Sequence, residues 1–297
     1  MGNSALFAWK EEMKKVLILI LAASILTAGW YYFDYRRPGF EAHIIDVGEG
    51  EAILLRTKEG TNALIDAGGL PGAWHLVDYL KKNGVKKIDH LILTHPDPDH
   101  ISGVFFLIPE FKVGNVYDNG EDISGIAKSQ DLYRWYTELV RAHPRYQVLK
   151  RGDTLTMGSV VLRIVWPPQP LPQRGFNDNS LVIMAARGPQ RMLLTGDLSN
   201  QGQQEVLKGG NVRAQILKVA HHGAVDATSA EFLKEVAPHI AVISVNKNNL
   251  RGYPSEEVVQ RLQKYNVRVY RTDRDGNIIF TFRRHSQLNP QVKSTGK

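Results

Sequence analysis

The six residues from 95 to 100, His-Pro-Asp-Pro-Asp-His, contain four side chains of types that bind metal ions, namely His95, Asp97, Asp99 and His100. The two prolines between them disfavour helix, so we expect an extended segment in which alternate side chains point to the same side. His100 can join the others if a helix begins near Ile101. Two imidazoles and two carboxylates this close together would compete for protons unless a cation lay among them. The pattern predicts a metal site, and the alternative is an acidic, solvated turn.

Further residues that bind metals follow apolar runs elsewhere in the chain. Asp197 follows the run 191–195, and the tandem pair His221 and His222 follows the run 216–220. Such runs predict buried strands. Ligands at the ends of strands are held by a rigid sheet, which suits a catalytic metal centre. One histidine of the pair is expected to bind metal and its neighbour to pack or hydrogen-bond beside it, and the sequence leaves open which.

Several other polar residues are weaker candidates. Asp66 is a candidate hydrogen-bond partner for a ligand histidine, and a turn-forming role is the alternative. Asn179 and Ser180 are candidates for substrate contact, and a polar turn ahead of a strand is the alternative. Lys247 and Arg251 are candidates for phosphate contact, and exposed, solvated charges are the alternative.

Composition narrows the classes of protein. The chain has 297 residues, enough for one large domain or two small ones. It contains no cysteine, which excludes thiolate zinc sites, disulfides and cysteine nucleophiles. The formal charge is +7, of which +2 falls in residues 1–37 and +4 in residues 283–297, so the body between them carries +1. Composition therefore does not establish a basic surface for nucleic acid on the body.

The run 16–33 is apolar and uncharged, and it is long enough to span a bilayer. Three aromatic residues near its end lie where an aromatic belt belongs, and lysines precede it, so the rest of the chain is expected outside the cytoplasm. We expect residues 1–37 to be an uncleaved, single-pass anchor in the cell membrane. The alternatives are a cleaved signal peptide, which would give a secreted protein, and a buried core helix.

The body is expected to be one α/β domain over residues 38–284. Short apolar runs separated by glycines predict strands, and amphipathic segments such as 74–83 and 255–265 predict helices. A hairpin is expected across residues 275–277, which read Asp-Gly-Asn. Residues 285–297 form a polar, basic tail that we expect to be disordered.

In order and spacing, the motifs resemble the metallo-β-lactamase superfamily and, within it, the extracytoplasmic domain of the ComEC DNA-uptake proteins. The similarity extends over residues 40–282. It rests on segments that are weak separately and specific together: DVGEGEA at 46–52, IDAGG at 65–69, the 95–100 loop, NSLV at 179–182, LTGD at 194–197, LKVAHHG at 217–223, and RTD at 271–273 with DG at 275–276. The resemblance implies a four-layer αββα sandwich, here preceded by one hydrophobic helix, with a dinuclear metal site at one edge.

The resemblance also implies roles for the candidate ligands. His95 and Asp97 would bind the first of two divalent ions, and Asp99, His100 and one of the tandem histidines the second. Asp197 would bridge both, because a carboxylate has two oxygens. A water shared by two cations is acidified enough to supply hydroxide near neutral pH. Asp99 would also act in catalysis by orienting that water.

The chain departs from the family pattern at several positions. Asp97 stands where the broad superfamily has histidine, and the neighbourhood of Asn179 lacks another ligand histidine. A site poorer in nitrogen and richer in oxygen favours manganese, with zinc as the alternative. Ala224 and Tyr253 stand where ComEC-like domains usually have serine and histidine, in segments expected to face the substrate.

We therefore expect an exported, membrane-tethered, metal-dependent hydrolase that acts on DNA or another phosphodiester, in DNA uptake and competence. One alternative is a lactonase or β-lactamase-type hydrolase of a small molecule, which the nearly neutral body favours. The other is a non-catalytic binding module on the same fold. The sequence does not reveal the oligomeric state.

Overall fold

The computed structural model describes residues 3–36, 38–128, 130–283 and 291–295. Within these residues the chain forms two sheets that pack face to face. The strands of the first sheet are, in spatial order, β15 (Gln291–Ser294), β14 (Ile278–Arg283), β1 (Pro38–Ile44), β2 (Ile53–Thr57), β3 (Asn62–Ile65), β4 (Lys87–Ile92), β5 (Lys112–Asp118) and β6 (Tyr146–Val148). Those of the second are β13 (Arg268–Arg271), β12 (Ile240–Ile243), β11 (Ile216–Lys218), β10 (Gln190–Leu194), β9 (Val182–Arg187), β8 (Val160–Trp166) and β7 (Thr154–Met157).

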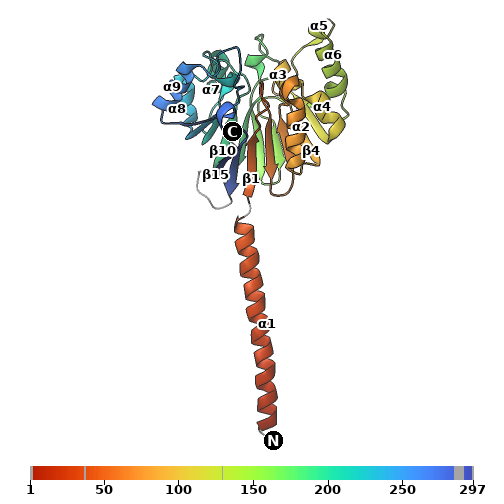
Figure 1. The fold of residues 1–297 in the computed structure, drawn as a ribbon, viewed down its shortest axis with the longest axis vertical. Helices are drawn as coiled ribbons and strands as arrows, with labels where there is room; N and C mark the ends of the chain where they lie inside the picture. Colours follow the sequence, from red (N-terminus) through yellow and green to blue (C-terminus); the bar gives the residue numbers. More distant parts are fainter. Residues whose placement is uncertain (1–2, 37, 129, 284–290, 296–297) are drawn as a thin grey trace.

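Helices cover the outer faces of both sheets, as Figure 1 shows. Beside the first sheet lie α2 (Ala73–Lys82), α3 (Pro98–Ile101), α4 (Val104–Glu110), α5 (Ser124–Ala127), α6 (Asp131–Tyr136) and the π-helix η2 (Thr137–Arg141). Beside the second lie α7 (Asn200–Lys208), α8 (Ala230–Val236) and α9 (Glu256–Lys264). The helix α10 (Thr272–Asp275) connects the sheets, and short 3-10 turns are η1 (Leu70–Gly72), η3 (Asn177–Asn179) and η4 (Ala220–Gly223).

Three buried apolar clusters hold the layers together. One fills the space between the sheets, where the rings of Phe40 and Phe282 stack with centroids 4.0 Å apart. The other two lie between each sheet and its helices. Helix α9 shows the pattern: Val258 and Leu262, one turn apart, are buried, and Ser255 caps the helix by accepting the backbone N–H of Val258. This is the four-layer αββα sandwich that the sequence predicts.

Parallel pairing brings the candidate ligands to one edge. Strands β3 to β6 and β10 to β13 run parallel within their sheets. Ile65 pairs with Ile92, and Leu194 with Lys218, so neighbouring strands end level with one another. Loops that follow the carboxyl ends of such strands lie together, which is where sheets of this kind place their sites.

The predicted hairpin at 275–277 is wrong. Strand β13 lies in the second sheet beside β12, whereas β14 lies in the first sheet beside β1. Gly276, with a φ of 64°, does turn the chain, but the turn delivers it to the other sheet. The apolar side chains of β14 are buried between the sheets there, and that burial outweighs the local preference for a hairpin.

The predicted disorder of residues 285–297 is wrong for part of the tail. Residues 291–294 form β15, which pairs antiparallel with β14. A polar segment gains backbone hydrogen bonds at a free sheet edge, and Val292 adds a contact with the core. The remaining predicted tail, residues 285–290 and 296–297, and residue 284 at the end of the predicted domain lie outside the described residues.

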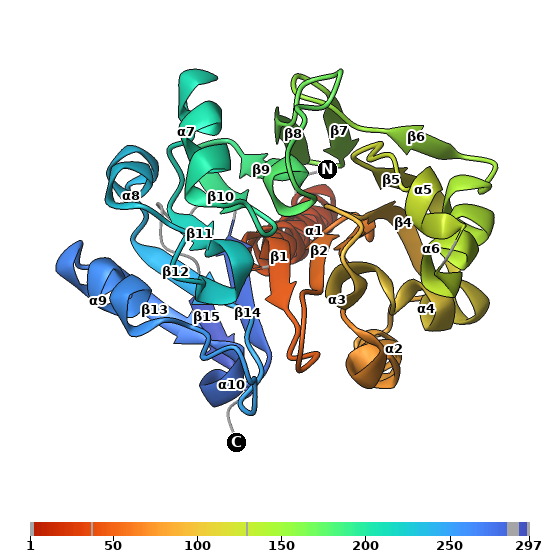
Figure 2. The same cartoon turned by 90° about the horizontal axis from the view of Figure 1, so that it is seen from above.

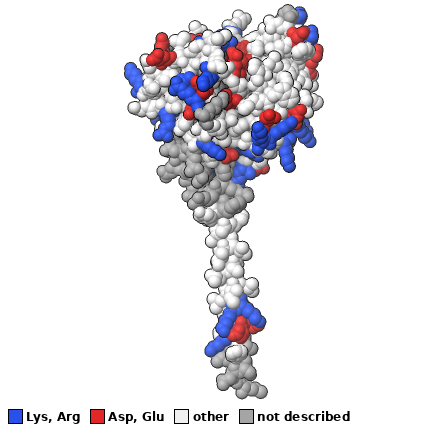
Figure 3. All heavy atoms as spheres, viewed as in Figure 1, with Lys and Arg blue, Asp and Glu red and all other residues white. Residues whose placement is uncertain are grey.

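Helix α1 (Asn3–Arg36) projects from the end of the body where β1 begins (Figure 1). Its stretch Trp9–Tyr32 is long and apolar enough to cross a membrane, by length and composition. That stretch is not buried against the body, which contradicts the core-helix alternative. Figure 3 shows charged side chains near the far end of this helix and none along its middle. Helix α3 lies toward the opposite end of the body (Figures 1 and 2).

Candidate metal centre

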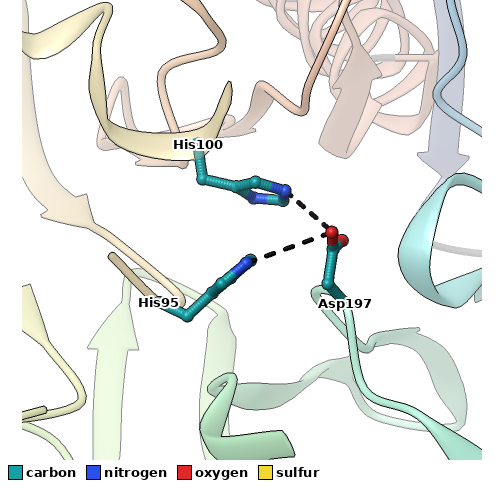
Figure 4. A group of neighbouring side chains, drawn as sticks. All are labelled: His95, His100 and Asp197. Carbon is teal, nitrogen blue, oxygen red and sulfur yellow. Dashed lines mark ion pairs between the residues drawn. The ribbon is translucent and has the colours of Figure 1, made fainter. Parts of the chain in front are cut away.

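Three histidines and one aspartate, contributed by both sheets, point at one another at the strand ends. Figure 4 shows His95 and His100, which follow β4, facing Asp197, which follows β10. Nε2 of His100 lies 3.3 Å from Oδ1 of Asp197, and Nε2 of His95 lies 4.0 Å from its Oδ2. His222, which follows β11, places its Nε2 3.4 Å from the same Oδ2. All four side chains are buried.

Asp66 orients both histidines of the first sheet. Nδ1 of His100 lies 2.7 Å from Oδ2 of Asp66. The hydroxyl of Thr94 donates to the same oxygen at 2.7 Å, so it accepts from Nδ1 of His95 at 2.9 Å. An acceptor beside each Nδ1 places the ring hydrogen there, and the lone pair of each neutral ring then lies on Nε2.

His222 is oriented in the same way by the second sheet, because its Nδ1 lies 2.9 Å from the carbonyl oxygen of Ser244. The inward Nε2 atoms of all three histidines and Oδ1 of Asp197 are buried and have no hydrogen-bond partner among the described residues. Each unpaired buried polar atom costs about 1–3 kcal/mol. A divalent cation would satisfy all four, since it binds imidazole lone pairs and carboxylate oxygens. The residues present therefore fit a metal centre.

Two groups of ligand atoms are compact enough to hold a cation each. One consists of His95, His100 and Asp197, and the other of Asp99, His100 and His222. Within each group the ligand atoms lie within 4.8 Å of one another. The groups share His100, and Asp197 borders both, which is the arrangement expected of a dinuclear centre.

The two remaining carboxylates lie at the outer side of the centre. Oδ2 of Asp97 is 3.6 Å from Nε2 of His95, and Oδ2 of Asp99 is 3.4 Å from Nε2 of His222. Their side chains are 30% and 18% exposed, respectively. Burial raises the pKa of Asp99, but the imidazoles of His222, whose Nε2 lies 3.4 Å away, and His100 outweigh burial and hold that pKa well below its ordinary value.

The backbone of residues 95–100 differs from the prediction in one respect. It is extended only as far as Asp97, and α3 begins at Pro98 rather than near Ile101. Proline suits the first helical position because its missing N–H has no partner to lose there. Asp99 and His100 therefore project from a helical turn and not from an extended strand.

The centre favours positive charge. Burial by itself lowers the pKa of His222, but the carboxylate of Asp197 outweighs burial and raises this pKa to about 9. The pKa of His100 also lies well above its ordinary value, because Asp197 and Asp66 together overcome burial. Burial raises the pKa of Asp197, yet His100 and His222 hold it well below the ordinary value.

Of the tandem histidines, His222 belongs to a compact ligand group and His221 does not. Nε2 of His221 lies 4.0 Å from Oδ2 of Asp197 and 3.4 Å from the side-chain amide of Asn177, and its side chain is 16% exposed.

Both tandem histidines, His221 and His222, have positive φ values, 48° and 53°, which residues other than glycine rarely adopt. Such strain persists only where the surroundings hold it, and it is common at functional sites.

Asn179 and Ser180 are completely buried, so their predicted contact with substrate is not supported. The amide of Asn179 donates to the carboxylate of Glu121 at 2.8 Å. The hydroxyl of Ser180 accepts the backbone N–H of Asp197 at 3.2 Å. At Gly196, where φ is 50°, a Cβ would lie 2.8 Å from that of Ser180, so glycine permits the close approach that places Asp197.

A buried ion pair that the sequence does not predict lies beside the centre. The carboxylate of Glu51 contacts the ammonium of Lys218, and both side chains are fully buried. The backbone N–H of Glu51 donates to the carbonyl of Asp99 at 3.3 Å, and Lys218 lies three residues before His221. The pair thus joins the two sides of the centre. The one sign of this pair in the sequence is a charged residue, Lys218, inside the apolar run 216–220.

Comparisons with known proteins agree with this geometry. A family model described as the metallo-beta-lactamase superfamily matches residues 45–245. ComE operon protein 3 of Bacillus subtilis (strain 168) is 32% identical over 261 residues, which cover 82% of this chain and 33% of that protein. Competence protein ComA of Neisseria gonorrhoeae is 28% identical over 268 residues, which cover 87% of this chain and 35% of that protein. The chain therefore spans about a third of the length of these relatives.

A solved structure confirms the fold. Zn(2+)-bound PqqB from Methylobacterium extorquens matches this chain with a TM-score of 0.52 and 9% sequence identity. The match covers 81% of this chain and 100% of that one. At this identity the likeness concerns the fold alone.

Proposed function

The chain belongs to the metallo-beta-lactamase superfamily, and from that premise we propose that it is a metal-dependent phosphodiesterase whose substrate is DNA. The observation that carries the hydrolase is the set of inward-facing, unpartnered ligand atoms supplied by both sheets. Support for DNA comes from the resemblance of the motifs to the domain of the ComEC DNA-uptake proteins, and from a relative that is named a competence protein and is similar to 87% of this chain.

The proposed ligands divide between two cations and share one bridging carboxylate: His95 and Asp97 for the first, Asp99, His100 and His222 for the second, and Asp197 between them. Bound divalent metals would supply hydroxide near neutral pH and neutralise charge on the phosphate. Asp66 and Thr94 keep the histidine lone pairs facing inward. Asp99 is the most exposed of the three ligands proposed for the second cation, and it would accept a hydrogen bond from an attacking water.

We propose manganese as the native metal, because the outer side of the centre is formed by the carboxylates of Asp97 and Asp99. Carboxylates suit harder ions, whereas imidazole suits zinc. The Methylobacterium protein with this fold is zinc-bound, so zinc is the ion against which manganese is tested.

We further propose that α1 anchors the protein in the membrane with the body on the extracytoplasmic side. Lys10, Lys14 and Lys15 precede the apolar stretch, which orients such helices with their N-terminus in the cytoplasm. Helix α3, which carries Asp99 and His100, lies toward the end of the body away from α1 (Figure 1), so substrate would approach from the side remote from the bilayer. N-terminal sequencing of protein recovered from membranes distinguishes an anchor from a cleaved signal peptide.

The test is cleavage by the full chain in detergent, with manganese, zinc, magnesium or a chelator. Two substrates are compared: an end-labelled single-stranded oligonucleotide and bis(p-nitrophenyl) phosphate, a diester that has no neighbouring phosphate. We expect both to be cleaved, fastest with manganese, and both activities to be lost in Asp197→Ala. Arg213→Ala, an exposed substitution, is the matched control.

Other outcomes would redirect the assignment. Cleavage of a lactone or a β-lactam, with neither diester cut, would favour the small-molecule hydrolase, which the mixed charge of the face in Figure 3 also suits. Metal binding without any hydrolysis would favour a binding module.

A further inference from the structure

The loop between β12 and α9 brings an arginine to the edge of the metal centre. A narrow cavity of about 20 Å³, with room for one water-sized group, lies between the centre and this loop. Asp99 and His222 line it on one side, and Asn246, Arg251 and Tyr253 on the other. Arg251 therefore lies across this cavity from the ligands of the second proposed cation, beside the centre and not among its ligands.

This loop is fixed by internal hydrogen bonds. The side-chain amide of Asn249 donates to the carbonyls of Asn246 and Tyr253, both at 2.8 Å, and its oxygen accepts the N–H of Tyr253 at 2.8 Å. The ring of Tyr253 lies nearly parallel to that of His222, with centroids 6.4 Å apart. The N–H of Ser255 donates to the carbonyl of Gly223 at 2.8 Å. The loop thus keeps a fixed position beside the ligand histidine.

The guanidinium of Arg251 is exposed, and it has no partner within the part of the chain that the structure describes. Among the described residues, no hydrogen-bond or ion-pair partner of its side chain is found, whereas Arg271 is paired with Asp273 at 2.6 and 2.9 Å. A guanidinium presents a planar set of donors that matches two oxygens of one phosphate. The exposed side chain of Arg251 is therefore free to bind a phosphate outside the mouth of this cavity.

Lys247, on the same loop, lies in different surroundings. It lines a wider adjoining cavity of about 340 Å³, together with Asp46, Glu49 and Asp273. Those carboxylates offset its charge and disfavour a phosphate there. The two cavities share Glu49 and Asn246, whereas Asp46 and Asp273 line only the cavity of Lys247.

We propose that Arg251 forms a phosphate subsite, which binds the phosphate next to the one being cleaved in a single-stranded substrate. This inference rests on the proposed phosphodiesterase function. It adds a residue that makes the enzyme prefer an oligonucleotide to a diester with a single phosphate. Because the subsite acts on a neighbouring phosphate, it contributes to binding of the polymer and not to the chemistry of one diester.

The test compares Arg251→Gln with Lys247→Gln in the full chain on the two substrates above. For Arg251→Gln we expect kcat/KM on the oligonucleotide to fall roughly tenfold or more, mostly through KM. The slope of log(kcat/KM) against log(salt) should become shallower by about 0.7, the value for one lost contact on a single strand. Hydrolysis of bis(p-nitrophenyl) phosphate should be unchanged, and Arg251→Lys should recover part of the loss.

Each contrary result has a separate meaning. An equal loss on both substrates would show that the loop acts on the centre itself and would overturn the subsite. An equal effect of Lys247→Gln on the oligonucleotide would indicate general charge attraction and would also overturn it. If the wild-type protein cleaves the minimal diester and no oligonucleotide, the DNA assignment fails together with the subsite. If it cleaves neither, the proposed phosphodiesterase itself is wrong.

Discussion

The two sides of the candidate centre are held in different ways. On the side of the first sheet, one buried carboxylate, Asp66, accepts three hydrogen bonds of 2.7 Å: from the N–H and the hydroxyl of Thr94 and from His100. On the side of the second sheet, His222 is held by one backbone carbonyl, and its neighbours are the partly exposed Tyr253 and the exposed Arg251.

This difference separates two tasks. A fully paired network of buried charges is rigid, and rigid ligands bind a cation without a further ordering cost. Loops with exposed side chains can contact substrates of varied shape. We infer that the network of Asp66 on the first-sheet side holds its ligands ready for a cation, whereas the loop beside His222 on the second-sheet side determines which substrate the proposed hydrolase cleaves.

The largest expected effect comes from breaking the ion pair that joins the two sides. Lys218→Met leaves the carboxylate of Glu51 buried without its cation, and loss of one partner of a buried pair costs about 3–5 kcal/mol. Chemical denaturation of the full chain in detergent measures this change. The double variant Glu51→Leu/Lys218→Met removes both charges and should recover most of the loss. A double variant as unstable as the single one would mean that packing, and not charge, is what the pair provides.

Removal of metal should affect the two sides unequally. A metal at 100 times its dissociation constant stabilises the folded state by about 2.7 kcal/mol, so chelation should lower the melting temperature. The internal hydrogen bonds of Asp66 persist without metal, whereas His222 loses its main partner. Amide hydrogen exchange should therefore rise more in residues 219–225 and 244–253 than in residues 64–68 and 92–102. Equal rises in both sets would contradict the proposed division.

Asp66→Asn should weaken metal binding about 10–100-fold, the usual cost of losing a partner that orients a ligand. The new amide NH₂ donates to Nδ1 of His100 and so drives the ring hydrogen onto Nε2, which then has no lone pair for a cation. Isothermal titration with manganese measures the affinity. Asp46→Asn is the matched control, because Asp46 is partly exposed and its carboxylate contacts the N–H of Gly48 at 3.2 Å. A similar loss of manganese affinity in both variants would mean that removal of any negative charge near the centre weakens binding, whatever its contact with His100.

The fold and the ligands differ in how far the sequence determines them. Apolar runs before Asp66, His95, Asp197 and His221 predicted strands, and each such strand is present, since burial of apolar side chains is encoded locally. Which sheet a strand joins is not encoded locally, so the turn residues around Gly276 predict a hairpin although β13 and β14 lie in different sheets.

Partners of the ligands were harder to predict than the ligands themselves. Thr94 orients His95, but threonine is too common a residue to indicate that role. Ser244 contributes only its backbone carbonyl to His222, which any residue could supply, so the sequence contains no motif for either contact. For Asn179 the sequence leaves substrate contact and a polar turn as alternatives, because an amide in a turn has the same appearance in sequence whether it faces inward or outward. Its burial follows from packing across distant segments, which spacing does not encode.

The smallest effect is expected on the second-sheet side. Asn249→Ala removes three hydrogen bonds within a partly exposed loop, and because water replaces them the free energy of unfolding should fall by only about 1 kcal/mol. The loop that carries Arg251 would nonetheless lose its fixed position, so kcat/KM on an oligonucleotide should fall several-fold while manganese affinity stays unchanged. Asn248→Ala is the control, because the Asn248 side chain makes no hydrogen bond that the described part of the chain reveals. A fall in metal affinity in Asn249→Ala would place this loop among the structures that hold the cations, and the two sides would then share one task.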